Sequence, residues 1–164
     1  MPTAQEQAVT DVLAERGAHY ELLPHRYTVT ARAEARALGL EPKEVAKTIV
    51  VRGPSGYLRV VLPASERVDL GKLRALLGTD GDIRLATQAE LAAAYPGFEL
   101  GAVPPLGGPA GDTVFVDLRL TRHASLVFEA GSHEESMRLK TDDLLELADA
   151  RITDVCEGAR AIRT

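Results

Sequence analysis

Residues 101–111, with the sequence GAVPPLGGPAG, constrain the fold of this chain more than any other stretch. The segment contains four glycines and three prolines. Proline removes a backbone donor and clashes inside a helix, so we predict neither a helix nor a central strand here. Glycine also lets the backbone approach a ligand closely. By itself the segment is typical of a surface connection, so its meaning depends on the motifs around it.

The composition is that of an ordinary globular chain. It has 164 residues, 45% hydrophobic and 26% charged, and we expect one domain spanning residues 1–164. Cys156 is the only cysteine, so the chain cannot form an internal disulfide or a multi-cysteine zinc site. No apolar run approaches the length of a membrane span, and the N-terminal residues lack a signal-peptide pattern. We therefore expect a cytoplasmic location and no membrane partner.

Charges are unevenly distributed along the chain. The net charge of −5 argues against a protein that coats nucleic acid through phosphate contacts. Residues 26–59 nevertheless carry seven Lys or Arg against three Glu, whereas residues 129–157 are strongly acidic. This asymmetry could steer a polyanion or an RNA end to one side of the molecule. It is equally compatible with solvated charges scattered over the surface.

Capping and periodicity patterns predict interleaved helices and strands. This interleaving, together with hairpin-like neighbours, favours a mixed α/β (α+β) domain over a doubly wound parallel sheet. The predicted helices are 3–17, 28 or 30 to 39, 69–78, 87–96 and 141–147. The predicted strands are 19–23, 47–52, 57–62, 83–86, 113–120, 125–130, 137–140 and 151–156.

Several common catalytic patterns are missing. The chain has no GxGxxG dinucleotide fingerprint and no GxSxG nucleophile elbow, and the run 107–113 lacks the lysine of a phosphate loop. The four histidines have no metal-ligand spacing, and Met137 stands where a second histidine would complete HExxH. Cys156 has no histidine near it in sequence and is expected to be a small core residue. We therefore expect no metal, no cofactor and no covalent nucleophile.

Four short motifs occur in a characteristic order along the chain. VAKTIVV at 45–51 is a strand start that carries Lys47, and GAVPPLG at 101–107 fits a GxxxP loop. The other two motifs are Val-Asp at 116–117 and AGSH at 130–133. Together they resemble the YbaK/prolyl-tRNA-synthetase-associated domain family, whose members are trans-editing aminoacyl-tRNA deacylases. The resemblance extends over residues 24–155.

The resemblance implies a single domain with a bent, barrel-like mixed β-sheet flanked by helices. The implied activity is hydrolysis of the ester that joins a small amino acid, such as Ala, Ser, Cys or Pro, to the 3′ end of a mischarged tRNA. The implied partners are the tRNA acceptor end and, in addition, an aminoacyl-tRNA synthetase. Neither a metal nor an organic cofactor is implied.

The same resemblance supplies the candidate site residues. Backbone N–H groups of a fixed Gly/Pro loop can stabilise the oxyanion that develops during ester hydrolysis. Gly101 and Ala102 are the expected donors, because the two prolines that follow have no N–H and stiffen the loop. Lys47 could contact a terminal phosphate or the ester carbonyl. The predicted catalytic residues are Lys47, Gly101 and Ala102, and the predicted substrate-binding residues are Thr30, Thr48, Val103, Pro104, Pro105, Gly131, Ser132 and His133.

Ordinary structural roles compete with these assignments. A lysine at a strand end is usually solvated. His133 could be a polar loop residue, and Asp117 is expected on an exposed strand face or as a local structural acceptor. Residues 106–111 are expected to be an ordinary connection. On this division of the loop, Gly101→Val should abolish activity whereas Gly108→Ala should matter little.

Two other functions stay open on the sequence alone. A non-catalytic module could keep the same pocket and bind an RNA 3′ end, a nucleotide or a synthetase without turnover. A hydrolase of a small metabolite ester would act independently of the tRNA body. The presence of Lys47 and of the 101–105 loop favours the deacylase over the non-catalytic module.

Overall fold

The computed structural model describes residues 4–79, 81–108 and 111–158, with the backbone alone for residues 4–8. The helices are α1 (Ala4–Glu15), α2 (Ala31–Leu38), α3 (Leu70–Leu77), α4 (Gln88–Ala94) and α5 (Thr141–Leu147), and two 3₁₀ turns are η1 (Pro42–Glu44) and η2 (Leu118–Arg122). The strands are β1 (Tyr20–Pro24), β2 (Ala46–Gly53), β3 (Gly56–Pro63), β4 (Arg84–Leu85), β5 (Thr113–Asp117), β6 (Ser125–Ser132), β7 (Glu135–Lys140) and β8 (Arg151–Thr153).

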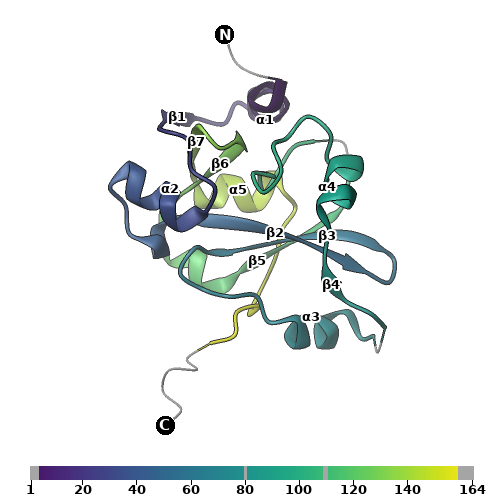
Figure 1. The fold of residues 1–164 in the computed structure, drawn as a ribbon. Coiled ribbons are helices and arrows are strands. Elements are labelled where there is room, and N and C mark those ends of the chain that lie inside the picture. The colour runs from purple at the N-terminus through teal and green to yellow at the C-terminus, as the bar shows by residue number, and fades with distance from the viewer. Residues whose placement is uncertain (1–3, 80, 109–110, 159–164) are drawn as a thin grey trace.

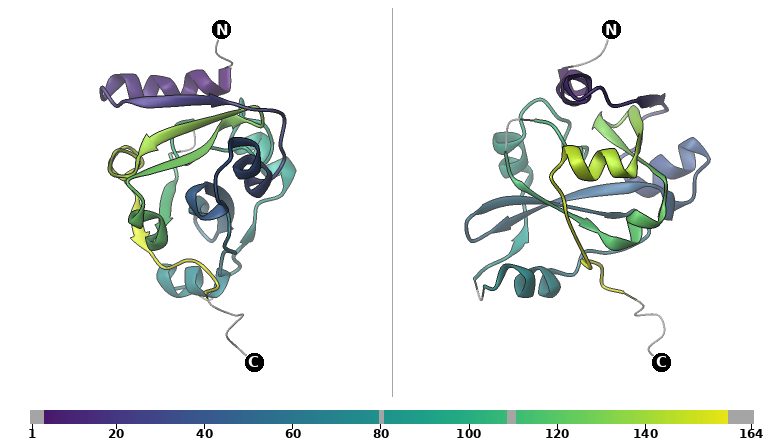
Figure 2. Two further views of the ribbon diagram at one scale, coloured as in Figure 1. Left: turned by 90° about the vertical axis from the view of Figure 1, so that its left-hand side faces the viewer. Right: turned by 180° about the vertical axis from the view of Figure 1, so that it is seen from behind.

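The strands form two sheets that share one apolar core. The smaller sheet has the order β1-β7-β6 and is antiparallel, and the larger has the order β4-β2-β3-β5-β8 with both antiparallel and parallel pairs. Figures 1 and 2 show α1 lying over the small sheet and α3 at the far end of the molecule, beyond the larger sheet. The predicted mixed α/β fold is confirmed. The single barrel-like sheet is not formed, because the strands divide between two sheets.

The start of β2 lies at the junction of the two sheets. Val45, just before β2, forms a parallel bridge with Val127 of β6. Both side chains are buried in one small apolar cluster with Ala35 of α2 and Ala64. Lys47 follows Val45 by two positions, so it is held close to both α2 and β6.

The predicted strand 113–120 is shorter than expected, because Asp117 ends it. The Asp117 side chain is fully buried and accepts hydrogen bonds from the backbone N–H groups of Arg119 and Val155, both at 2.9 Å. These contacts turn the chain into η2 directly after β5. Asp117 is therefore a structural acceptor and does not lie on an exposed strand face.

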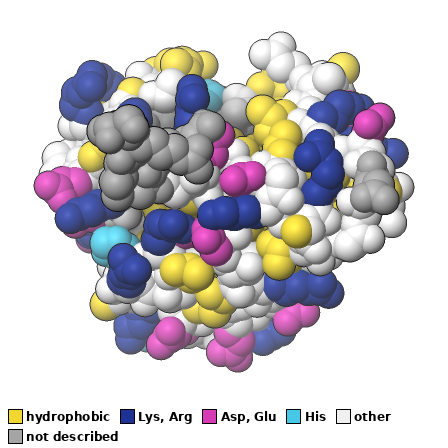
Figure 3. All heavy atoms as spheres, turned by 90° about the horizontal axis from the view of Figure 1, so that it is seen from below, with side chains coloured by type: hydrophobic (Ala, Val, Ile, Leu, Met, Phe, Trp, Pro, Cys, Tyr) yellow, Lys and Arg dark blue, Asp and Glu magenta, His cyan; other side chains and the backbone are white. Residues whose placement is uncertain are grey.

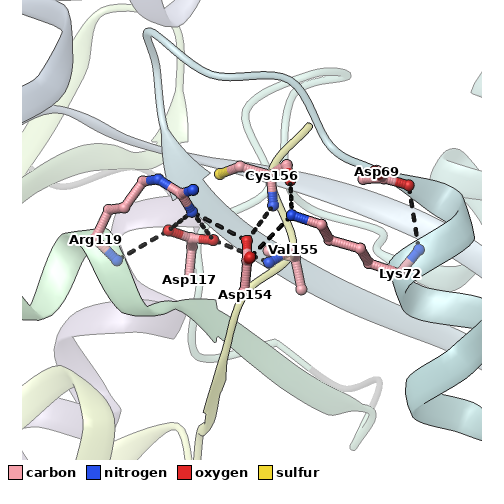
Figure 4. A network of polar contacts seen from close by, with 7 residues as sticks. All are labelled: Asp69, Lys72, Asp117, Arg119, Asp154, Val155 and Cys156. Atoms are coloured by element: carbon pink, nitrogen blue, oxygen red, sulfur yellow. Dashed lines mark hydrogen bonds and ion pairs between the residues drawn. The ribbon is translucent and has the colours of Figure 1, made fainter. Parts of the chain in front are cut away.

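The same network ties the C-terminal segment to α3. Figure 4 shows Asp154 between Arg119 on one side and Lys72 on the other, with distances of 3.1 and 2.9 Å to their nitrogens. Lys72 also donates to the carbonyl of Cys156 at 2.6 Å. The Cys156 side chain is buried, as predicted, and lies in the core cluster that α3 covers.

The helix caps follow the sequence patterns with one exception. Thr141 is the first residue of α5 rather than its cap, because its hydroxyl donates to the carbonyl of His123 at 2.6 Å. The cap predicted at residue 3 lies outside the described residues. Three predicted caps accept hydrogen bonds from N–H groups of the first helical turn, namely Thr30, Asp69 and Thr87.

The face that carries α3 mixes charges of both signs. Figure 3 shows Lys or Arg and Asp or Glu side chains interspersed there, with small hydrophobic areas between them. This face therefore gives no support to electrostatic steering of a polyanion. Of the helices that the structure describes, none is long and apolar enough to cross a membrane.

Candidate active site

A small pocket lies where α2, the start of β2, β6 and the loop after α4 meet. Its volume is about 220 Å³. Five residues predicted from the sequence line it: Thr30, Lys47, Thr48, Gly101 and Val103. The other lining residues are Val29, Ala31, Ala46, Ile49 and Glu129. The fold thus brings motifs that are distant in sequence to one site.

Lys47 is half-buried in this lining. Its ammonium group forms no hydrogen bond or ion pair with any residue that the structure describes. Burial lowers the pKa of Lys47 below its ordinary value, and the positive charge of Arg32 lowers it further. Lys47 is therefore a partly desolvated group without a counter-ion, which differs from a solvated lysine at a strand end.

The loop that contains Gly101 is held on both sides by buried side chains. Before it, the carbonyl of Leu100 accepts a hydrogen bond from His133 Nε2 at 2.7 Å. After it, the carbonyl of Pro104 accepts one from Arg59 Nη1 at 2.8 Å. Gly101 itself has a φ of +83°, a conformation that favours glycine. The loop is therefore fixed before any substrate enters, as effective oxyanion donors must be.

Arg59 is an anchor of this loop that the sequence patterns did not single out. It lies in β3, is 4% exposed, and binds the carboxylate of Asp112 through Nε at 3.1 Å and Nη2 at 2.9 Å. Tyr95 donates its hydroxyl to the same carboxylate, and its ring centre lies 5.4 Å from the guanidinium carbon. A buried ion pair with added hydrogen bonds holds its members in one geometry.

The donor assignment from the sequence needs one correction. The N–H of Ala102 donates to the carbonyl of Glu99 at 3.0 Å, and Ala102 is buried outside the pocket lining. It is therefore not free to bind an oxyanion. The N–H groups of Gly101 and Val103 form no hydrogen bond within the described part of the chain, and both residues line the pocket. Val103 replaces Ala102 as the second candidate donor.

Four predicted substrate contacts lie outside the pocket lining and are buried. They are Pro104, Pro105, Gly131 and Ser132. The carbonyl of Gly131 accepts the N–H of Glu99 at 2.9 Å, so the end of β6 supports the turn that leads into the loop. In this structure the four residues therefore lie outside the pocket, and none of them is exposed in its lining.

His133 is also placed behind the pocket, with both ring nitrogens engaged. Nε2 lies against the carbonyl of Leu100, which can only accept, so Nε2 carries a proton. Nδ1 lies 2.8 Å from Oε2 of Glu129. The residue is 4% exposed and does not line the pocket. His133 is thus a polar residue of the β6–β7 turn, one of the two alternatives expected from the sequence, but it is buried, lies outside the pocket lining and holds the carbonyl that precedes Gly101.

Two buried carboxyl groups near the pocket were missed in the sequence. Glu34 of α2 accepts a hydrogen bond from the Ser136 hydroxyl through Oε2, while its Oε1 has no partner among the described residues. Burial raises the pKa of Glu34 to about 8, against the opposing effect of Ser136, and the charge of Glu129 adds to the rise. Burial, with a contribution from Glu99, raises the pKa of Glu129 to about 8 as well. No local sequence pattern indicates that a glutamate is buried, so these two carboxyl groups are recognised only from the packing of the folded chain.

Replacing Glu34 with glutamine is expected to make folding stability less dependent on pH. The pKa of Glu34 is about 8 in the folded protein against an ordinary value of 4.5, so between these values the folded state binds the extra proton. This group therefore lowers stability as pH rises from about 5 to about 8, by on the order of 3 kcal/mol, and an amide does not. Urea unfolding at the two pH values measures the effect. Glu15→Gln, on the exposed end of α1, is the matched control, and an unchanged pH dependence in Glu34→Gln would contradict the assignment.

The expectation that Gly108→Ala matters little concerns activity, and the structure adds an expected effect on stability. A Cβ at Gly108 would lie 2.7 Å from Cε2 and 3.1 Å from Cζ of the buried Phe98 ring, and φ is +83°. We expect a loss of about 2–4 kcal/mol in the free energy of unfolding, from overpacking and backbone strain together. Gly97→Ala is the control, because it has a φ of +94° and no atom within 4 Å of the added Cβ. Equal losses in the two variants would show that the Phe98 contact has no effect.

A larger hollow, of about 580 Å³, lies at the opposite end of β2 from Lys47. Its lining contains the β2–β3 turn, Phe115 and Arg151, and none of the predicted site residues. Volume alone therefore does not identify the site. Within the residues described, no group of three His, Cys, Asp or Glu side chains could hold a metal ion.

Known proteins are similar to this chain in sequence and in fold. A family model described as "Aminoacyl-tRNA editing domain" matches residues 25–147. The "Multifunctional Ser/Thr-tRNA deacylase ProXp-y" of Escherichia coli (strain K12) is 26% identical over 155 residues, which cover 90% of each chain. The "Proline--tRNA ligase" of Thermosipho melanesiensis is 30% identical over 78 residues, which cover 48% of this chain and 14% of the ligase. A crystal structure described as "a putative trans-editing enzyme for prolyl tRNA synthetase" has a TM-score of 0.86 and 29% identity, and covers 96% of this chain and 100% of its own.

The two-sheet fold is shared with a structure described as a trans-editing enzyme, which places the chain in the class of editing domains. The matching model covers most of the chain, so the protein belongs to the aminoacyl-tRNA editing domain family. By class it is an aminoacyl-tRNA hydrolase. The resemblance found in the sequence is confirmed.

Proposed function

We propose that this protein removes a small amino acid, such as Ala, Ser, Cys or Pro, from a mischarged tRNA, and that the reaction takes place in the pocket beside Lys47. The observation that carries the proposal is the meeting of Lys47 with Gly101 and Val103 in one lining. One group can supply positive charge and the other two can supply unpaired N–H donors.

The size of the pocket supports a small aminoacyl group. About 220 Å³ is less than the roughly 300–1,000 Å³ of pockets that hold drug-sized ligands. The aminoacyl group would enter, while the terminal adenosine would stay at the mouth. Val29, which is 64% exposed and lines the pocket, offers apolar surface there.

The chemistry requires a water molecule to add to the ester carbonyl. The carbonyl oxygen then becomes an oxyanion, which the N–H groups of Gly101 and Val103 would stabilise. Lys47 would place its charge against the ester carbonyl or the terminal phosphate. Collapse of the tetrahedral intermediate breaks the ester bond, and the ribose oxygen leaves with a proton as the tRNA 3′-terminal hydroxyl. The products are the free amino acid and uncharged tRNA.

The relatives guide the choice of substrates. The Escherichia coli relative is described as a Ser/Thr-tRNA deacylase, and a structural neighbour is described as an editing enzyme for prolyl tRNA synthetase. One methylene changes discrimination by only about 1–3 kcal/mol in an apolar pocket, so small side chains must be compared directly. The expected partners are the tRNA acceptor end and an aminoacyl-tRNA synthetase.

The test is a deacylation panel with the purified protein. We expect at least one tRNA charged with Ala, Ser, Thr, Cys or Pro to lose its amino acid faster than the uncatalysed rate, and tRNAs charged with Leu or Phe to stay intact. A panel that stays intact throughout would overturn the proposal and favour a non-catalytic binding module. Equal rates on a charged minihelix and on a free amino-acid ester would instead indicate a hydrolase of small esters.

A further inference from the structure

The pocket has a second charged residue opposite in sign to Lys47. Among the described lining residues, Lys47 and Glu129 are the charged ones, and no ion pair joins them. The Glu129 side chain is 10% exposed, so it is nearly enclosed yet reaches the lining. The pocket therefore offers one basic and one acidic side chain to a single small ligand.

A contact with His133, which lies outside the pocket lining, fixes the orientation of the Glu129 side chain. Its Oε2 lies 2.8 Å from Nδ1 of His133, whose other nitrogen is bound to the carbonyl of Leu100. The pairing between β6 and β7 is shifted between Glu129 and Ser132, and a bulge of this kind re-aims side chains beside a site. Oε1 forms no hydrogen bond with any residue that the structure describes. One oxygen is thus held by the protein while the other is available to a ligand.

The substrate class carries a matching cation. An aminoacyl ester has an α-ammonium group one carbon away from the ester carbonyl, whereas the terminal phosphate and the developing oxyanion are negative. We propose that Glu129 binds the α-ammonium group of the aminoacyl ester and so makes the pocket select α-amino esters over neutral α-hydroxy esters. This inference rests on the proposed deacylase function.

Burial supports the same assignment. A carboxylate without a counter-ion is costly to bury, which is why the pKa of Glu129 is raised to about 8 and the carboxyl is mostly protonated at pH 7 while the pocket is empty. Binding of an ammonium group would favour the ionised form. A bound ammonium would supply the missing counter-charge through a charge-assisted hydrogen bond. Lys47 then remains available to the terminal phosphate or the developing oxyanion, so each charged group of the substrate has a partner of opposite charge.

The test compares esters that differ only in the α-substituent. Alanyl-tRNA is paired with lactyl-tRNA, and seryl-tRNA with glyceryl-tRNA, at about pH 7 where an α-amino group is largely protonated. The ratio of kcat/KM values within a pair is measured for the wild-type protein and for Glu129→Gln. We expect the ratio to fall at least tenfold in the variant, with the rate on the hydroxy ester nearly unchanged. Because both proteins act on the same esters, the greater intrinsic reactivity of the amino ester cancels.

Glu134→Gln is the control, because Glu134 is exposed in the turn next to His133 and lies outside the pocket lining. The ratio of kcat/KM values for the amino and hydroxy esters should be the same in this variant as in the wild-type protein. Equal losses on both esters in Glu129→Gln would show a purely structural role and overturn the inference, although the deacylase function would stand. Absence of hydrolysis of every ester by the wild-type protein would instead overturn the proposed function, and the inference with it.

Discussion

Replacing Lys47 with alanine is expected to lower the single-turnover deacylation rate by about 10²–10³-fold, the usual effect of removing one electrostatic stabiliser of an oxyanion. The side chain is half-buried, has no protein partner in the described residues and lines the pocket, so its loss removes positive charge from the site and little else. Rates are measured with saturating protein and the tRNA that the panel identifies as substrate.

Lys43→Ala is the matched control for this substitution. Lys43 lies in η1 only four positions away, but its side chain is 66% exposed and contacts Glu41 at the surface. Its removal should leave both the rate and the free energy of unfolding within experimental error. If Lys47→Ala retained more than about half of the wild-type rate, the assignment of Lys47 to the reaction would be wrong.

Replacing Gly101 with valine is expected to lower the deacylation rate by at least about 10²-fold. A Cβ at this position would lie 3.6 Å from Cε1 and 3.7 Å from Nε2 of His133, and φ is +83°. The branches of valine would crowd the imidazole that holds the Leu100 carbonyl, and the backbone would relax away from its present conformation. The N–H groups of Gly101 and Val103 would then no longer be oriented to bind the oxyanion.

Gly101→Ala and Gly97→Ala separate this effect from general strain. Both glycines have positive φ values, but no atom lies within 4 Å of a Cβ at Gly97. The two alanine variants should lose a similar free energy of unfolding, about 1–2 kcal/mol. Only the Gly101 variant should lose activity. Parallel losses of activity in both variants would mean that the loop is not a site of oxyanion binding.

The local patterns of the sequence were sufficient for most of the helices and strands. Caps such as Thr30 and the alternation of residues 47–62 depend on neighbours in sequence, so they predict α2 and the β2–β3 hairpin correctly. The resemblance to editing domains named Lys47 and Gly101, which the fold brings into one pocket.

The long-range contacts could not be predicted. The N–H of Glu99 donates to the carbonyl of Gly131, and His133 donates to the carbonyl of Leu100, because the end of β6 lies next to the loop although it is far along the chain. Glu129 looked like one charge in an acidic segment, and only the β6 pairing places it in the pocket. Such roles depend on tertiary packing, which no local pattern encodes.

The division of the strands between two sheets has the same origin. Alternation predicted a strand up to residue 120, but it does not show that the side chain of Asp117 caps the following turn. The chain leaves the larger sheet at that point and continues as β6 of the smaller one. A buried acceptor that binds residues 119 and 155 is a tertiary feature, and its effect on topology follows from contacts between distant segments.

The most direct test of the central claim is to locate the bound substrate. A non-hydrolysable aminoacyl-adenosine analogue is titrated into the ¹⁵N-labelled protein, and amide resonances are followed by NMR. We predict that the resonances of Gly101, Val103 and Lys47 shift together, while those of Gly56 and Phe115, which line the larger hollow, do not. Shifts confined to the larger hollow, or no shifts at saturating analogue, would contradict the placement of the active site beside Lys47.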